Sequence, residues 1–370
     1  MNGFKIVPQI ECYEDAPSFV EANPFCEDDF ILISKSVYEH DFKAITQVGK
    51  VFFRSKYGQG EPNSDMVNAL IRDFLDSGSK RIIAVGGGSV MDMAKLLCVC
   101  ESGFDCQYLF DHQDELKHNY PLILVPTTCG SGSEVSNISI VEMLNMKTKL
   151  GLAKDPLYAD KAILIPSLLN SVPDFYLYTS AVDGLVHAIE SYLSARSNVY
   201  TRLFQEKAIR LYINNFLQLQ QGVDRAQLME SFMVASNMAG LSFANTGTGC
   251  VHGISYPLSG TYHVTHGLAN SIFLAEVLKM YERLRPEEVL NDLKQLVADC
   301  LGCEVKDAFE KLDQLIRFIV EVPTLSSLGM KEEEIVTFSE SVVLNQQRLM
   351  SNGYVNLNKE QIQEIYKTLF

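Results

Sequence analysis

The sequence predicts a two-domain fold, with an α/β domain built on a parallel sheet over residues 1–165 and an all-helical domain over residues 166–370. Three observations support this prediction. A chain of 370 residues is longer than single hydrophobic cores usually become, so its length favours two domains. The first part alternates short β-rich runs with helix-like stretches. The part after about residue 167 keeps a long helical periodicity with few strand signals.

Short runs of branched apolar residues mark the expected strands of the first domain. These runs are FILIS (30–34), KVFF (50–53), RIIAV (81–85), LILVP (122–126), KLGLA (149–153) and KAILIP (161–166). Between the second and third runs, Asn63 or Ser64 is suited to cap a helix in which apolar residues recur at helical spacing. Strands that are apolar almost throughout and alternate with helices are typical of a parallel sheet covered on both faces.

The second domain is expected to consist of helices. Three stretches keep the helical period, namely RLFQEKAIRLYINNFLQLQQ, RAQLMESFMVASNMAG and KEEEIVTFSESVVLNQQRLM. The change in pattern puts the domain boundary near residue 165, and the sequence contains no internal repeat and no low-complexity linker.

The composition narrows the class of protein. A formal net charge of −15 argues against nonspecific binding to nucleic acid, which needs clustered lysine and arginine. The sequence does not start with a basic region followed by an apolar stretch, and no apolar run approaches the roughly 18 residues of a membrane-spanning helix. We therefore expect a soluble, cytoplasmic protein without membrane contact, whose nine cysteines are reduced thiols rather than a disulfide framework.

A glycine-rich turn follows the third expected strand. In IIAVGGGSVMDMAKLLCV, three consecutive glycines (86–88) remove side chains where the strand meets a helix N-terminus, and the next residue, Ser89, adds a hydroxyl donor. Backbone N–H groups and the helix dipole can hold a pyrophosphate in this geometry. The turn matches neither the G-x-G-x-x-G fingerprint nor a Walker P-loop, so a purely structural tight turn is the alternative.

The next expected strand ends in a second polar turn. Thr127 and Thr128 follow this strand directly, before Gly-Ser-Gly-Ser at residues 130–133. Ligands of open α/β sheets bind at the carboxyl ends of the strands, so the two turns together indicate a nucleotide site. The register of the glycines and serines does not fit G-x-S-x-G, which argues against a serine hydrolase.

An aspartate and several histidines form a candidate metal site in the second domain. Asp183 and His187, in TSAVDGLVHAIESYLS, are four residues apart and so share one helix face. The segment GCVHGISYPLSGTYHVTHG supplies His252, His263 and His266. One carboxylate with three imidazoles suits Fe(II) or Zn(II) and requires no thiolate. The residues alone leave open whether His263 or His266 is a ligand.

Four motifs together resemble the iron-containing, group III alcohol dehydrogenases, a family that shares its fold with dehydroquinate synthase. They are AVGGGSVMDMAK, PTTCGSGSEVS, AVDGLVHAIESY and VHGISYPLSGTYHVTHG, which occur in the family's order over residues 84–267. The resemblance implies that the first domain binds a dinucleotide, NAD or alternatively NADP, and that the second binds Fe(II) or alternatively Zn(II). It also implies a small alcohol or aldehyde substrate and assembly into a homodimer or larger oligomer.

The resemblance also implies roles for individual residues. The metal ligands fall on Asp183, His187, His252 and His266. His263 is thereby left outside the ligand set. The residues expected to hold the cofactor are Gly87, Gly88, Ser89, Thr127 and Thr128, with Lys149 reaching its ribose.

Three positions depart from the family's pattern. Ser34 stands where many members have an acidic residue that anchors the adenosine ribose, which leaves both NAD and NADP open. Glu61, which precedes Pro62, stands where the family has the asparagine of an Asn-Pro pair. Tyr256 replaces a histidine that is proposed to relay protons, so Tyr256 is a candidate relay, with a core tyrosine as the alternative.

The flanking segments indicate a particular activity within the family. KYGQGEP and QQRLMSNGY most resemble members that act on 4-hydroxybutyrate, which implies its reversible oxidation to succinic semialdehyde. The metal would lower the pKa of the alcohol before hydride passes to the nicotinamide, in a cleft between the domains. His263 is the candidate for binding the substrate carboxylate, because an acidic protein offers no general attraction for an anion.

Three other functions remain as alternatives. One is another primary-alcohol or diol dehydrogenase of the same family. A dehydroquinate synthase-like lyase would need basic residues around the metal for its phosphate-bearing substrate, but segments 179–194 and 249–267 contain no lysine or arginine. A noncatalytic metal-binding scaffold would not need the two cofactor turns.

Overall fold

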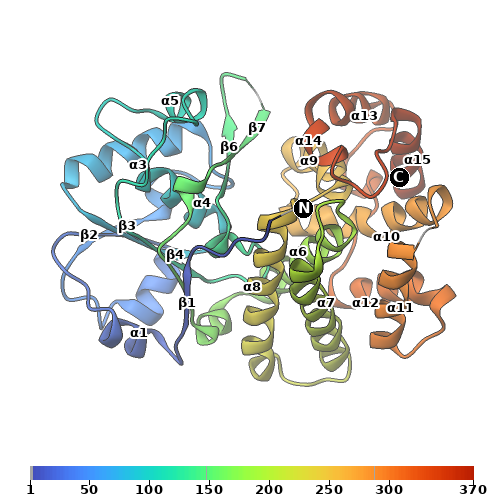
Figure 1. Cartoon of the computed structure of the whole chain (residues 1–370), viewed down its shortest axis with the longest axis horizontal. Coiled ribbons are helices and arrows are strands. Elements are labelled where there is room, and N and C mark those ends of the chain that lie inside the picture. The colour runs from blue at the N-terminus through green and yellow to red at the C-terminus, as the bar shows by residue number, and fades with distance from the viewer. Residues whose placement is uncertain (1–2, 147, 287) are drawn as a thin grey trace. The chain divides into compact units, whose positions relative to one another are not determined.

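The computed structural model describes residues 3–146, 148–286 and 288–370 (Figure 1). The chain forms two compact units, one of Ile6–Val172 and one of Pro173–Phe370, the latter including the segment that ends at Lys5. Each unit has its own buried core.

The boundary between the units lies at Val172, later in the chain than the expected residue 165. After the last strand of the first unit, the chain continues in a 3₁₀ helix, η5 (Pro166–Ser171). Leu168 of this helix is buried in the first unit's core, so the helix belongs with the sheet that precedes it.

The first unit is built on a six-stranded sheet in which every strand pair is parallel, as predicted. The strand order is β1-β8-β5-β4-β2-β3. The strands are β1 (Gln9–Cys12), β2 (Asp29–Ile33), β3 (Lys50–Phe53), β4 (Arg81–Gly86), β5 (Leu122–Pro126) and β8 (Lys161–Leu164).

One expected strand lies outside this sheet. The run at 149–153 belongs to β7 (Thr148–Ala153), which pairs antiparallel with β6 (Ile138–Met143) in a separate two-stranded sheet. Strands β1 and β6 were not predicted from the sequence. Neither is a continuous buried run, because β1 is partly exposed along its length and β6 alternates between buried and half-buried residues.

The side chains of the parallel sheet alternate between two cores. The even-numbered residues of β2 join the core that contains α3 (Ser64–Ser77) and α4 (Gly88–Cys98). Ile31 and Ile33 join the opposite core, which contains α1 (Ala16–Ala22). Burial on both faces is the reason that these strands are apolar almost throughout.

The second unit is helical, as predicted, and its described residues contain no strand. Its helices of more than ten residues are α6 (Asp174–Leu193), α7 (Val199–Gln220), α8 (Met229–Thr246), α9 (Cys250–Tyr262), α10 (His266–Leu284), α11 (Glu288–Leu301), α12 (Ala308–Ile319), α13 (Glu334–Asn345) and α15 (Lys359–Leu369). The short helix α14 (Gln347–Met350) follows α13. Over the described parts of both units, no helix has the length and apolar character needed to cross a membrane.

Helix α6 is the buried centre of the second unit and packs against α7, α8 and α10. Two glycines permit this close packing. A Cβ atom at Gly184 would lie 1.9 Å from the Tyr212 hydroxyl, and one at Gly267 would lie 2.1 Å from the carbonyl oxygen of Thr179. Helix α10 therefore starts directly against α6, which brings its first residue beside Asp183.

Candidate metal and cofactor sites

Asp183 and His187 are buried one turn apart on α6. Oδ2 of Asp183 lies 4.0 Å from Nδ1 of His187, so the predicted helical spacing does bring the two side chains together. The imidazole of His187 also stacks on the rings of Phe243 and His252, with centroid distances of 4.5 and 4.6 Å. This stacking fixes the plane of the His187 ring.

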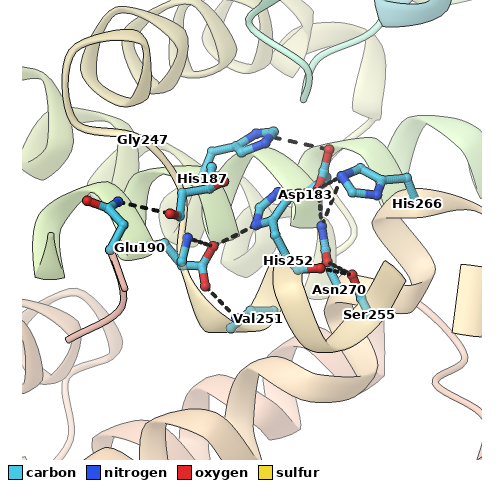
Figure 2. Close-up of polar contacts among 12 residues, drawn as sticks. Asp183, His187, Glu190, Gly247, Val251, His252, Ser255, His266 and Asn270 are labelled. Carbon is cyan, nitrogen blue, oxygen red and sulfur yellow. Dashed lines mark hydrogen bonds and ion pairs between the residues drawn. The ribbon is translucent and has the colours of Figure 1, made fainter. Parts of the chain in front are cut away.

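Two further imidazoles reach the same carboxylate. Nε2 of His252, on α9, is 3.8 Å from Oδ1 of Asp183, and Nε2 of His266, the first residue of α10, is 3.6 Å from the same oxygen. One possible ligand atom from each of these residues and from His187 lies within 4.8 Å of the others. Figure 2 shows the three imidazoles around the Asp183 carboxylate. The structure thus groups the four residues that the family resemblance implied.

Glu190 orients His252 from the other side of its ring. Oε2 of Glu190 accepts a hydrogen bond from Nδ1 of His252 at 2.6 Å and another from the Gly249 amide at 2.8 Å. Oε1 accepts from the Val251 amide at 2.6 Å. Gly249 is the N-cap of α9 and has no side chain, so Glu190 caps this helix from α6. With the proton on Nδ1, Nε2 of His252 presents its lone pair to the cluster.

Glu190 and a second supporting residue, Asn270, were not predicted from the sequence. Glu190 is seven residues after Asp183 on α6, a helical spacing that could have identified it. Nδ2 of Asn270 donates to Oδ1 of Asp183 at 2.7 Å, and Ser255 Oγ donates to Oδ1 of Asn270 at 2.6 Å. Asn270 is four residues after His266, but its contact with Asp183 depends on helix packing that the sequence does not display.

Burial and neighbouring charges set the protonation of the site. Burial raises the pKa of Glu190 to about 7, against the effect of the two backbone amides that it accepts from. Burial also lowers the pKa of His252 well below its usual value, and the other two imidazoles act in the same direction. For Asp183, burial favours the neutral acid, but the imidazoles and the Asn270 hydrogen bond together lower its pKa. An ionised carboxylate and a neutral imidazole are the forms that bind a divalent cation.

The cluster fits a divalent metal ion. Nε2 of His252 is buried and has no hydrogen-bond partner among the described residues. A buried polar atom without a partner is costly, and a coordinated cation would satisfy it. One carboxylate oxygen and three imidazole nitrogens form a donor set suited to Fe(II) or Zn(II).

In the first unit, the two predicted glycine-rich turns contact each other at the carboxyl edge of the sheet. Strands β4 and β5 are paired up to their last residues. A Cβ atom at Gly87 would lie 3.2 Å from Thr128 Cγ2, and one at Gly88 would lie 3.0 Å from Ser131 Cβ. The glycines therefore permit this close approach. Ser89 is in the first turn of α4, whose N-terminal amides are at the same edge.

A buried lysine that was not predicted from the sequence holds the second turn in place. Lys95, on α4, donates from Nζ to Ser133 Oγ at 2.6 Å, to Ser136 Oγ at 3.0 Å and to the Ile138 carbonyl at 2.8 Å. Ser133 Oγ in turn donates to Oδ1 of Asp92 at 2.6 Å. Burial lowers the pKa of Lys95, and the charge of Asp92 opposes this effect. This cluster ties the loop after Thr127 and Thr128 to the helix that follows the glycine turn.

Ser34 and Lys149, the two residues expected at the ribose, are also in the first unit. Ser34 directly follows β2, and its N–H donates to the carbonyl of Val85, near the end of β4, at 3.2 Å. Ser34 is thus at the edge that carries the first glycine turn. Lys149, on β7, forms an ion pair with Glu61, one of the residues that departs from the family's pattern. A ribose would compete with Glu61 for this ammonium group.

Tyr256 lies beside the metal-ligand cluster, whereas His263 is at the end of α9. The ring centroid of Tyr256 is 5.9 Å from that of His266, and Tyr256 is one helical turn after His252. His263 has an exposed side chain and a left-handed backbone, with φ of 54°, at the C-cap. Such a φ is uncommon for residues other than glycine, and it ends the helix before α10 begins.

The chain thus combines a helical unit that carries an Asp-His₃ cluster suited to a divalent metal with a parallel α/β unit that carries two glycine-rich turns. The chain is a member of the iron-containing alcohol dehydrogenase family. A family model described as iron-containing alcohol dehydrogenase matches residues 25–166. A second, described as the C-terminal part of the Fe-containing alcohol dehydrogenase family, matches residues 177–370.

Individual relatives agree with the family. The chain is 40% identical over 372 aligned positions to the 4-hydroxybutyrate dehydrogenase of Clostridium kluyveri, with all of both chains covered. It is 31% identical to long-chain-alcohol dehydrogenase 1 of Geobacillus thermodenitrificans, over 78% of this chain and 74% of the relative.

Solved structures share the fold. The sulfoacetaldehyde reductase of Bifidobacterium kashiwanohense in complex with NAD⁺ has a TM-score of 0.86 at 20% identity, covering 100% of this chain and 98% of the other. A 1,3-propanediol oxidoreductase has a TM-score of 0.82 at 23% identity, with both chains fully covered.

Proposed function

We propose that this protein is a metal-dependent NAD(P) oxidoreductase that interconverts 4-hydroxybutyrate and succinic semialdehyde. The observation that carries this proposal is the 40% identity to the Clostridium kluyveri 4-hydroxybutyrate dehydrogenase, which extends over the whole of both chains. The identity to the long-chain-alcohol dehydrogenase is lower and covers less of the chain, so a substrate with a long apolar tail is the second candidate.

The metal ion would be held by Asp183, His187, His252 and His266, with Fe(II) as the expected ion and Zn(II) as the alternative. A divalent cation supplies Lewis acidity that lowers the pKa of an alcohol. Asp183 contributes the one formal negative charge among the four ligands, and Glu190 keeps Nε2 of His252 deprotonated. Stacking on Phe243 shields His187 from water on one side of its ring.

The cofactor would be held at the carboxyl edge of the parallel sheet, by the residues Gly87, Gly88, Ser89, Thr127 and Thr128. Bound NAD or NADP supplies the hydride acceptor. The N-terminal amides of α4 and the adjacent hydroxyl groups are suited to bind the pyrophosphate. Lys95 and Asp92 keep the two turns together, and so act as positioning residues for this site.

Tyr256 is the proposed proton relay. Its ring is adjacent to that of His266, so it can pass a proton between the neighbourhood of the cluster and solvent. Tyr256 is half-buried, which leaves a route for the proton.

A substrate panel tests the proposed function. The protein is purified without oxygen, loaded with Fe(II) and mixed with NADH or NADPH, and the absorbance of the reduced nicotinamide is followed with succinic semialdehyde, butyraldehyde, a long-chain aldehyde and glyceraldehyde. We expect the highest kcat/KM for succinic semialdehyde and no turnover after chelation of the metal. A higher kcat/KM for the long-chain aldehyde would favour the second candidate. If the protein binds metal and nucleotide but reduces no aldehyde, both candidate functions are wrong and a lyase-like activity is favoured.

The choice between NAD and NADP can be tested at Ser34. We expect Ser34→Asp to raise KM for NADPH by about tenfold or more and to change KM for NADH much less, because a carboxylate repels the 2′-phosphate but accepts hydrogen bonds from ribose hydroxyls. Initial rates with each cofactor measure this effect. Ser36→Asp, two residues further along and exposed, is the control. Equal changes with both cofactors would show that Ser34 does not lie at the ribose.

A further inference from the structure

The proposed substrate needs a cation near the metal-ligand cluster. In 4-hydroxybutyrate, the carboxylate is about 6 Å from the reacting hydroxyl when the chain is extended. The protein has a net charge of −15, so its overall field repels an anion and does not guide it to the site. A local positive charge must therefore distinguish this substrate from an uncharged alcohol of the same length.

Helix α14 brings a segment of the C-terminal region next to His252. The buried residues Leu349 and Met350 pack on α9 at Gly253, the residue that follows His252. A Cβ atom at Gly253 would lie 3.5 Å from Leu349 Cβ and 3.0 Å from Met350 Sδ. The residue before this buried pair, Arg348, is exposed.

The chain after Arg348 is fixed to the residues that directly precede α9 and to the end of α6. Nδ2 of Asn352 donates to the carbonyl of Thr248 at 2.9 Å, and Ser194 Oγ donates to Oδ1 of Asn352 at 3.0 Å. Gly353 allows close packing here, because its Cα lies 3.3 Å from the position that a Cβ of Gly249 would occupy. Before Arg348, the Cβ of Gln346 lies 3.7 Å from the position that a Cβ of Gly253 would occupy, so the chain is held on both sides of the exposed arginine.

The guanidinium group of Arg348 is available to a ligand. Leu349, the next residue along the chain, packs against Gly253, which directly follows His252, so a long arginine side chain at position 348 can extend toward the surroundings of the cluster. Across the described residues, the Arg348 side chain forms no ion pair and no hydrogen bond.

The earlier candidate, His263, is less suitably located. It is eleven residues beyond His252 on α9, which at 1.5 Å per residue is about 16 Å along the helix axis. Arg348 is instead one residue before the pair that packs beside Gly253. A guanidinium group also binds a carboxylate through two parallel N–H donors and stays charged at every physiological pH, which an imidazole does not.

We propose that Arg348 is the specificity-determining residue that binds the substrate carboxylate, an inference that rests on the proposed function. The reacting end of the substrate would then be directed to the Asp183 cluster, while the carboxylate pairs with the guanidinium group. Aldehydes without a carboxylate would gain nothing from this contact.

The test compares Arg348→Gln and Arg348→Lys in the full-length, metal-loaded enzyme with two aldehydes of the same chain length. We expect Arg348→Gln to raise KM for succinic semialdehyde by about 10- to 100-fold and to leave KM for butyraldehyde unchanged, with wild-type metal content. Arg348→Lys should give an intermediate KM, because it keeps the charge and loses the paired donors. Titration calorimetry with butyrate should show the same order of affinities without any turnover.

Two further variants and the wild-type protein separate the possible outcomes. Arg317→Gln, an exposed arginine on α12, should change neither KM, and neither should His263→Ala. If Arg348→Gln affects both aldehydes equally or neither of them, or if His263→Ala gives the selective rise in KM, the assignment of Arg348 is wrong while the proposed function stands. If the wild-type enzyme shows no preference for succinic semialdehyde over butyraldehyde, the proposed function fails and this inference fails with it.

Discussion

Replacing Asp183 with asparagine is expected to abolish metal binding and to lower kcat/KM by about 10³-fold or more. Asparagine has nearly the same shape, so the packing of α6 is retained while the one negative charge of the ligand set is lost. A divalent cation would then face only neutral donors in a buried site, where its desolvation is not compensated. Metal content after purification, and titration with Co(II) followed by its visible absorbance, measure this loss directly.

Asp174→Asn is the matched control for this experiment. Asp174 is on the same helix, but it is exposed and pairs with Arg225 on the surface, so its replacement should leave metal content and activity unchanged. Far-UV circular dichroism of both variants checks that the helices are retained. An Asp183→Asn protein that binds metal as the wild type does would contradict the proposed ligand set.

Replacing Glu190 with glutamine is expected to weaken metal binding by about 10- to 100-fold, although Glu190 is not proposed as a ligand. The two carboxylate oxygens of Glu190 accept three hydrogen bonds, from Nδ1 of His252 and the amides of Gly249 and Val251. Glutamine has one acceptor oxygen, and its NH₂ group would face a donor. The simplest relief is for Nδ1 of His252 to accept from this NH₂, which moves the ring proton to Nε2 and removes the lone pair that points to the cluster.

Competition with a chelator of known affinity measures this change in metal binding, and the Co(II) spectrum reports an altered ligand set. Glu364→Gln, at an exposed pair with Arg283, is the control, and it should keep full affinity. Glu190→Gln should also lower the melting temperature of the metal-free protein, because α9 loses part of its N-cap. If the metal affinity is unchanged while the melting temperature is lowered, Glu190 acts only as a cap of α9 and does not tune metal binding.

The strands that could be predicted from the sequence are those in which consecutive residues are all buried. Strands β2, β4 and β5 are covered on both faces, so each is a continuous apolar run that stands out in the sequence. The alternating pattern of β6 and the edge position of β1 do not produce such runs. For β7, the apolar residues were recognised as a strand, but its antiparallel partner was not, because strand pairing is a contact between distant segments.

The spacing of residues predicted only part of the metal-ligand cluster. Asp183 and His187 share a face of one helix, and this follows from a spacing of four residues. The choice between His263 and His266 was not accessible from spacing, and only the family resemblance made it. In the structure, His263 ends α9 in a left-handed conformation, while Gly267 lets α10 start against α6 and so brings His266 to Asp183.

By itself, the sequence determined the two-part architecture, the glycine turns and the family, because these depend on periodicity and on motifs that are continuous along the chain. Only the tertiary structure decided which residues support the cluster. Glu190 and Asn270 contact His252 and Asp183 across helices. Helix α14, which carries Arg348, packs on α9 from more than ninety residues further along the chain than His252. Contacts of this kind depend on how side chains on different helices pack together, and the spacing of residues within one helix does not contain that information.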